Sequence, residues 1–147
     1  FEETYRRLRP TPGIHELVAA VHGRGGTVAV VSGGFHEVLD PLAADLRLDR
    51  WRANRLEVED GVLTGRLLGP IVDARGKAEA LAEWALEVGT PLSAAMAIGD
   101  GANDLEMMRV AGLSVAFNAK PIVREHADVA IENDLSRAIP LLDRLVA

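Results

Sequence analysis

Short apolar runs of four or five residues alternate along the chain with stretches in which apolar residues recur every three or four positions. The short runs predict buried strands, and the periodic stretches predict amphipathic helices. Strands are expected at 27–31, 94–98, 113–117 and 128–131, and helices at 13–23, 34–46, 76–87, 103–110, 121–126 and 135–145. Because strands that alternate with helices favour parallel pairing, the pattern predicts an open α/β sheet.

One segment departs from this alternation. The stretch 57–65 contains Asp60-Gly61 between two short runs of alternating character. Because Asp-Gly favours a tight reverse turn, this stretch predicts a β-hairpin. The pattern contains no internal repeat and no sign of a second domain, and 147 residues are enough for one domain with a core of its own.

The most informative polar residues follow the strand predicted at 94–98. Asp100, Asn103 and Asp104 lie in the run GDGAND at 99–104, where that strand passes into a helix. Ligands of open α/β sheets commonly bind at such a point, and carboxylate oxygens suit a hard cation such as Mg²⁺. The same residue types also form ordinary turns and helix N-caps, so the run alone leaves both interpretations open.

Polar residues occupy similar places elsewhere in the chain. Ser32-Gly33-Gly34 follows the strand 27–31, and a hydroxyl with backbone N–H groups at a helix N-terminus can hold a phosphate oxygen. Lys77 begins a later helix, and AFNAKP at 116–121 ends another strand. Each signal has an ordinary alternative, such as a strand-to-helix turn or a solvated lysine. His36 is expected to be an exposed helix residue, and a place at the mouth of the pocket near Ser32 is the alternative.

The order of these signals resembles that of the haloacid-dehalogenase-like phosphatases, and among them the phosphoserine phosphatases. That superfamily carries a hydroxyl residue after the second core strand, then a lysine, then a Gly-Asp-x-x-x-Asp motif, which here resemble Ser32, Lys77 and 99–104. Longer matching phrases extend from about residue 10 to the end: VVSGGF at 30–35, NRLEV at 54–58, GKAE at 76–79 and AFNAKP at 116–121. The resemblance implies a three-layer α/β/α, Rossmann-like core with a mostly parallel sheet and a β-hairpin.

The resemblance also implies a Mg²⁺-dependent phosphatase that hydrolyses O-phospho-L-serine through an aspartyl-phosphate, the last step of serine biosynthesis. Lys77 and Asp100 would be the catalytic residues that this chain supplies. Four residues would bind the substrate phosphate: Ser32, Gly33, Lys77 and Asn103. Asp100 would bind Mg²⁺, and Asp104 would be the second metal-site residue, orienting Asp100 and its loop. Another small phosphate monoester is the alternative substrate.

The chain departs from the family in one respect. The family nucleophile is the first aspartate of an Asp-x-Asp-x-Thr motif on the first core strand, and no Asp-x-Asp occurs in 1–147. We therefore expect 1–147 to be a partial hydrolase core without that strand and the cap domain, and inactive alone. A non-catalytic fragment or regulator is the alternative. Ion-pumping ATPases also carry the GDGxND phrase, but the LEMM that follows it at 105–108 differs from theirs.

In the fold of this family, the absent strand lies between the strands expected at 27–31 and 94–98. Its removal would leave these two about 10 Å apart, because neighbouring strands are about 4.8 Å apart. Each unpaired backbone group on the two edges would cost on the order of 1–3 kcal/mol, against a total stability of about 5–15 kcal/mol. We therefore expect the slot to be filled by an N-terminal segment, a neighbouring copy, or closure of the two strands onto each other.

The composition of the chain limits the classes of molecule that it is expected to bind. The chain is 48% hydrophobic and 26% charged, as globular domains are, and no apolar run approaches the about 20 residues that cross a bilayer. The absence of cysteine removes disulfides and thiolate metal sites and is compatible with a cytoplasmic location. A net charge of −6 with scattered basic residues gives little support to nucleic-acid binding. We expect a small phosphate monoester as partner, with no nucleic acid and no membrane.

Overall fold

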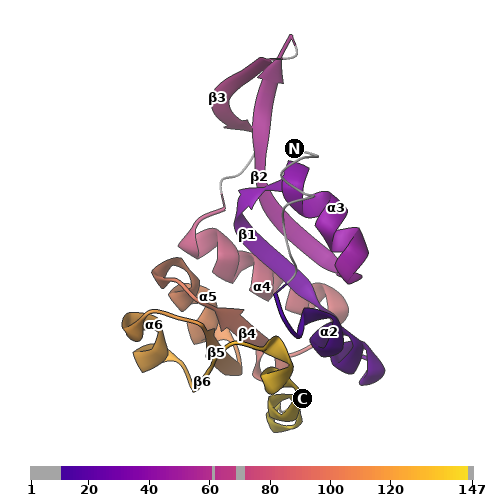
Figure 1. Cartoon of the computed structure of the whole chain (residues 1–147), viewed down its shortest axis with the longest axis vertical. Helices are drawn as coiled ribbons and strands as arrows, with labels where there is room; N and C mark the ends of the chain where they lie inside the picture. Colours follow the sequence, from indigo (N-terminus) through magenta and orange to yellow (C-terminus); the bar gives the residue numbers. More distant parts are fainter. Residues whose placement is uncertain (1–10, 61, 69–71, 146–147) are drawn as a thin grey trace.

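The structure is a computed structural model that describes residues 11–60, 62–68 and 72–145. Its helices and strands follow one another in regular order (Figure 1). They are α2 (Ile14–Gly23), β1 (Ala29–Phe35), α3 (His36–Leu46), β2 (Arg50–Glu59), β3 (Val62–Leu68), α4 (Ala74–Val88), η1 (Leu92–Ala94), β4 (Met96–Gly99), η2 (Ala102–Asp104), α5 (Leu105–Val110), β5 (Leu113–Phe117), α6 (Pro121–His126), β6 (Val129–Ile131) and η3 (Leu135–Arg144). In these residues no helix combines the length and the apolar character needed to cross a membrane.

The strands form two three-stranded sheets. In the first sheet the order is β1-β2-β3, with β1 and β2 parallel and β2 and β3 antiparallel. In the second sheet β4, β5 and β6 are all parallel. The α/β prediction is therefore confirmed, and β2–β3 is the predicted hairpin, which extends from one end of the molecule (Figure 1). Gly61 of the predicted turn lies outside the described residues.

Three strands extend beyond the residues predicted for them. β3 continues to Leu68, past the predicted end of the hairpin at residue 65. β2 begins at Arg50 because its first part pairs in parallel with β1, so the hairpin is only the second half of a strand that serves two partners. β1 continues through the Ser32–Gly34 segment to Phe35, and α3 therefore begins at His36.

The last predicted helix, at 135–145, is wrong in type. It is a 3-10 helix, η3, with Pro140 in its interior. Proline has no N–H to donate and its ring clashes with the carbonyl one turn earlier, so an α-helix is unfavourable at this position.

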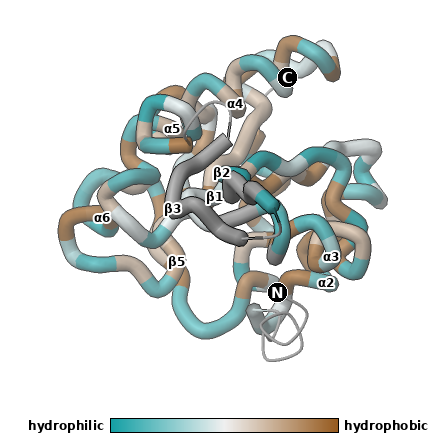
Figure 2. Tube along the Cα trace, turned by 90° about the horizontal axis from the view of Figure 1, so that it is seen from above, coloured by the Kyte–Doolittle hydropathy of each residue, from teal (hydrophilic) through white to brown (hydrophobic). Residues whose placement is uncertain are grey.

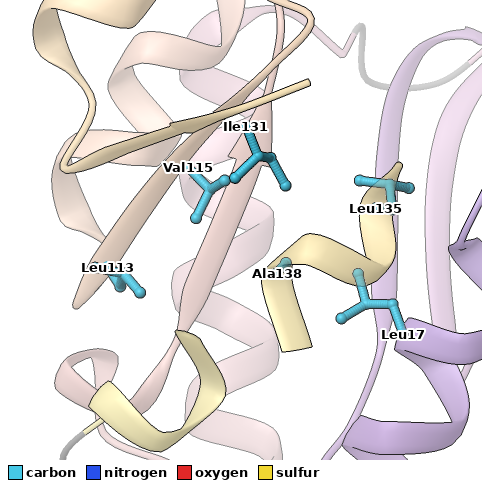
Figure 3. Packing of buried hydrophobic residues seen from close by; sticks show 6 residues of the cluster. All are labelled: Leu17, Leu113, Val115, Ile131, Leu135 and Ala138. Atoms are coloured by element: carbon cyan, nitrogen blue, oxygen red, sulfur yellow. The ribbon is translucent and has the colours of Figure 1, made fainter. Parts of the chain in front are cut away.

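Helices cover both faces of the second sheet. Successive side chains of a strand point to opposite faces, so the apolar residues on each face need a layer of helices to bury them. On one face Leu113 and Val115 of β5 pack with Leu17 of α2 and with Leu135 and Ala138 of η3 (Figure 3). On the other face a second cluster joins the sheet to α5 and α6: Ala97, Ala116, Met107, Met108 and Val123. This arrangement gives the predicted α/β/α layers. Figure 2 shows hydrophilic and hydrophobic residues alternating along the surrounding helices, as such layers require.

The first sheet is covered in the same way. Val30 of β1 packs with Ala43 and Leu46 of α3, whereas the next residue, Val31, packs against the cluster that α5 and α6 make with β4 and β5. Ala78 of α4 belongs to that same set of contacts. Side chains of β1, α4 and the second sheet therefore share one core, which joins the two sheets.

β1 and β4 are not paired with each other in the part of the chain that the structure describes. There each of them has a strand partner on one side only, which is β2 for β1 and β5 for β4. Closure of the two strands onto each other, one of the three expected arrangements, is therefore wrong. The two remaining arrangements, an N-terminal segment or a neighbouring copy, stay predictions.

Candidate active site

A buried ion pair joins two of the sequence motifs. Lys77 Nζ lies 2.7 Å from Asp104 Oδ1, and the side chains are only 9% and 8% exposed. Lys77 is in the first turn of α4, which Asp73 caps by accepting the Gly76 N–H at 2.8 Å. The pair therefore fixes the beginning of α4 against the loop that follows β4.

The second oxygen of Asp104 organises that loop. Asp104 Oδ2 accepts the backbone N–H groups of Asp100 at 3.0 Å and Gly101 at 3.2 Å. Burial by itself raises the pKa of Asp104, but the hydrogen bonds from Lys77 and from the two backbone N–H groups outweigh it and hold the pKa below its usual value. Asp104 is therefore ionised at neutral pH and is held by three donors.

The other two polar side chains of the loop are in a different position. The side chains of Asp100 and Asn103 are exposed. The Asp100 carboxylate forms no hydrogen bond or ion pair with any other described residue, whereas its backbone N–H is bound to Asp104. The loop is thus held through its backbone, which leaves the Asp100 carboxylate available to a ligand.

The Ser32–Gly34 segment is a bulge in β1 and not, as predicted, the N-terminus of a helix. Pairing between β1 and β2 passes from Val31↔Arg52 to Phe35↔Asn54, so β1 has two more residues than β2 in this interval. Ser32 Oγ accepts the Gly34 N–H at 2.9 Å, and its own hydrogen remains available to donate. Bulges are common next to active sites, where they direct side chains out of the sheet.

Asn54 connects this bulge to the beginning of α4. Its Nδ2 donates to the Gly33 carbonyl oxygen at 2.9 Å, and its Oδ1 accepts the Val72 N–H at 2.7 Å. The residue is only 6% exposed. Val72 directly precedes Asp73, the N-cap of α4, so one side chain joins the bulge to the helix that carries Lys77.

Three apolar side chains bring the same segments together. Val31, Ala78 and Leu105, each adjacent in sequence to one of the expected site residues, pack against one cluster. The structure therefore places Lys77 in direct contact with Asp104 and connects the Ser32–Gly34 bulge to the same helix. The beginning of α4 is therefore linked both to the bulge in β1 and to the loop that follows β4.

The donor set suits a magnesium ion. No group of three or more His, Asp or Glu side chains close enough to hold a metal occurs within the ranges that the structure describes. Mg²⁺ usually keeps several waters and takes one or two carboxylates together with substrate phosphate, so two carboxylates are enough. Asp100 could bind the ion directly, and Asp104 could hold Asp100 in position through the backbone of the loop.

The sequence analysis missed the environment of His36. His36 is half-buried, and its Nε2 accepts the Ala53 N–H at 3.0 Å, which leaves the ring proton on Nδ1, 2.8 Å from Asp40 Oδ1. The same Asp40 oxygen accepts the Trp51 indole N–H at 2.8 Å. His36 therefore holds α3 against β2, and the expectation of an exposed residue is wrong. The sequence does not reveal that His36 bonds Ala53 or that Asn54 bonds Gly33 and Val72, because these backbone partners are distant in the chain.

Comparisons with known proteins agree with this arrangement. The family model for haloacid dehalogenase-like hydrolases matches residues 1–109. Phosphoserine phosphatase of Streptococcus thermophilus is 49% identical over 146 residues, covering 99% of this chain and 68% of that protein. Phosphoserine phosphatase of Streptomyces coelicolor is 50% identical over 139 residues, covering 95% of this chain and 32% of that protein.

A solved structure described as a phospho-aspartyl intermediate analogue of phosphoserine phosphatase superposes with a TM-score of 0.89 at 42% identity. It covers 95% of this chain and 68% of that one. The matches extend over nearly all of the described residues, including both loops and α4. The chain belongs to the haloacid dehalogenase-like hydrolases.

Proposed function

We propose that the protein hydrolyses O-phospho-L-serine to serine and phosphate, the last step of serine biosynthesis, and that this chain supplies the phosphate- and metal-binding part of the site. The observation that carries the proposal is the buried Lys77–Asp104 pair, which holds the Lys77 ammonium group against the loop that carries Asp100 and Asn103. The similarity to phosphoserine phosphatases over nearly the whole chain supports the choice of substrate.

The phosphate-binding residues act through charge and position. Lys77 uses one of its three N–H donors on Asp104 and has two left for phosphate oxygens. Ser32 donates its hydroxyl and Gly33 its backbone N–H to the other oxygens, and Asn103 adds an exposed amide. Donors that are already in place stabilise the charge that builds up as phosphorus changes partners, and they hold the ester in line with its attacking group.

A divalent cation completes this set of charges. Asp100 would hold Mg²⁺, and Asp104 would keep Asp100 and its loop in position through the two backbone N–H groups that it binds. The ion would neutralise phosphate charge and polarise a phosphoryl oxygen.

The nucleophile belongs to a different stretch of polypeptide in this proposal. An aspartate on a segment outside the described residues would attack phosphorus while the bond to the serine oxygen breaks, and water would then hydrolyse the aspartyl-phosphate. Residues 1–147 would thus be a partial core, and a strand from that segment or from a neighbouring copy would lie between β1 and β4. The phospho-aspartyl description of a 42% identical structure supports this route.

The test compares the 147-residue chain with the complete gene product. Both are assayed with phosphoserine and with other small phosphate monoesters, with Mg²⁺ and after its removal by a chelator. We expect Mg²⁺-dependent turnover of phosphoserine by the complete product and none by the chain alone. If the complete product prefers another monoester, that compound is the substrate instead of phosphoserine. If it turns over none of them, a non-catalytic regulator is favoured. Fractionation of the native cells tests the cytoplasmic location that we infer.

A further inference from the structure

Asn54 is a buried polar residue without an assigned role. Its amide is among the few polar side chains that are almost fully buried in the described residues, and both of its polar atoms are bonded to backbone. A buried amide is tolerated in an apolar interior only when its hydrogen bonds are made. The identity of those two partners therefore indicates what the residue is for.

Both partners belong to segments that regular sheet pairing does not hold. The Gly33 carbonyl lies in the bulge, between the last regular pair, Val31↔Arg52, and the pair at which β1 and β2 meet again, Phe35↔Asn54. Asn54 is itself in that second pair, so its side chain reaches back along β1 and supplies a donor where the ladder is interrupted.

The second hydrogen bond of Asn54 connects the bulge to the segment that leads into α4. Asn54 Oδ1 accepts the Val72 N–H, and Val72 is followed by the N-cap residue of α4 and, one turn later, by Lys77. The Val72 carbonyl oxygen also faces the bulge, 3.9 Å from where a Cβ on Gly33 would lie. The distance between the bulge and the beginning of α4 is thus set by one planar carboxamide.

We propose that Asn54 is a positioning residue of the phosphate site, which holds the Ser32–Gly34 bulge in register with Lys77. The proposal rests on the proposed function, because it assumes that the bulge and the lysine bind the same phosphate group. Asn54 itself touches no phosphate. It acts through the backbone of Gly33 and Val72, and a displacement of about 1 Å at such donors is enough to slow a reaction about 100-fold.

The experiment uses the complete gene product and three variants. Asn54→Ala removes both hydrogen bonds. Asn54→Asp keeps an acceptor for Val72 but has no donor for Gly33 while it is ionised. Ser114→Ala is the matched control. Ser114 is also buried and also makes two side-chain hydrogen bonds, since its Oγ accepts the Asp128 N–H and donates to Asp128 Oδ2, but it lies near the start of β5, away from the bulge and from the loop after β4. For each protein we measure Tm, kcat and KM for phosphoserine, and the Kd of inorganic phosphate by calorimetry.

We expect Asn54→Ala and Ser114→Ala to lower Tm by comparable amounts of a few degrees. Only Asn54→Ala should weaken phosphate binding and reduce kcat/KM, each by 10-fold or more, with Ser114→Ala within about twofold of wild type. Asn54→Asp should be impaired near pH 7.5 and recover relative to wild type as the pH is lowered, because the protonated acid regains a donor for Gly33. A role in stability alone would not produce this recovery of phosphate affinity.

The outcomes separate this inference from the proposed function. If the wild type turns over phosphoserine and Asn54→Ala keeps its phosphate Kd and kcat within twofold, the positioning role is wrong and the proposed function stands. If the wild type binds phosphate but does not hydrolyse phosphoserine, the proposed function fails. The positioning role of Asn54 is then supported if Asn54→Ala binds phosphate 10-fold or more weakly, and is wrong if the Kd stays within twofold. If the wild type does not bind phosphate, both are overturned.

Discussion

At the scale of single residues, two carboxylates four positions apart in one loop have opposite environments. Asp104 is buried and accepts hydrogen bonds from Lys77 and from two backbone N–H groups. Asp100 is exposed, and its carboxylate makes no such contact with the other residues described. Removal of the Asp104 carboxylate should therefore lower the stability of the fold, and removal of the Asp100 carboxylate should affect only the chemistry.

Asp100→Asn and Asp104→Asn test this division in the complete gene product. Asp100→Asn should abolish Mg²⁺-dependent hydrolysis and change the free energy of unfolding by less than about 0.5 kcal/mol, as exposed substitutions do. Asp104→Asn leaves the Lys77 ammonium buried without its counter-charge and should cost about 3–5 kcal/mol. Urea unfolding and phosphoserine turnover are measured for both. Retained Mg²⁺-dependent turnover in Asp100→Asn would refute its metal role.

Lys77→Ala gives a second result at this scale. In the proposed function the ammonium group would stabilise charge on the transferring phosphate, so its loss should reduce kcat by on the order of 100-fold or more. Lys77→Arg keeps the charge but does not fit the buried contact with Asp104, and it should restore only part of the activity. Turnover of Lys77→Ala within a few fold of wild type, at a temperature where the variant is folded, would remove Lys77 from the site.

The pKa of Asp104 also predicts a pH dependence of stability. Because its pKa is lower in the folded state than in the unfolded chain, ionised Asp104 stabilises the fold above about pH 4. This stabilisation is lost as the pH falls from about 4 through the folded-state pKa. The difference in unfolding free energy between wild type and Asp104→Asn should therefore be constant near neutral pH and shrink below pH 4. A difference that does not change down to pH 2 would show that folding does not lower the pKa of Asp104.

At the scale of elements, the connection from β4 to η2 depends on a glycine. A Cβ on Gly99 would lie 2.5 Å from Asp104 Cβ, and the side chain of Asp104 is already fixed by its hydrogen bonds. The close approach of strand and loop is what lets Asp104 reach back to the amides at the start of its own loop.

Gly99→Ala should therefore lower both stability and activity. The clash has to be relieved by moving β4 or Asp104, and overpacking of this kind costs about 1–3 kcal/mol. Gly23→Ala is the matched control, because nothing lies within 4 Å of a Cβ there and the residue ends α2, so it should be neutral or slightly stabilising. Thermal unfolding and phosphoserine turnover are compared. A Gly99→Ala protein as stable and active as Gly23→Ala would contradict the close approach.

Prediction from the sequence succeeded for elements whose ends are marked locally. β5 matches the predicted 113–117 because an apolar run interrupted only by Ser114 ends at Asn118, which has a positive φ of 46°. α6 begins at Pro121, a favoured first helical residue. Prediction failed for the first part of β2, which forms a strand by pairing with β1, because the residues of one strand do not show which other segment pairs with it. The environments of Asn54 and His36 were missed for the same reason, since the backbone groups that bond their side chains are 17–21 residues away.

At the scale of the whole molecule, two sheets are held as one body by helices and not by strand pairing. Ile14 of α2 packs against the core of the second sheet and also against the core beneath α3, and Val31 extends the packing between α4 and β4. Among the residues that the structure describes, no strand pairs with the edge of β1 opposite β2 or with the edge of β4 opposite β5. A sheet edge exposes a row of N–H and C=O groups that readily pair with another strand.

These edges lead to a prediction about amide exchange. If a strand from outside the described residues lies between β1 and β4, the amides that point away from β2 and β5 should be protected from hydrogen exchange in the complete gene product. In the 147-residue chain alone, the same amides should exchange faster by 100-fold or more, because opening them requires no global unfolding. β5 is the internal control, since it is paired on both sides in either protein. Equal protection of β1, β4 and β5 in the chain alone would mean that the two edges are already covered, and the need for a further strand would disappear.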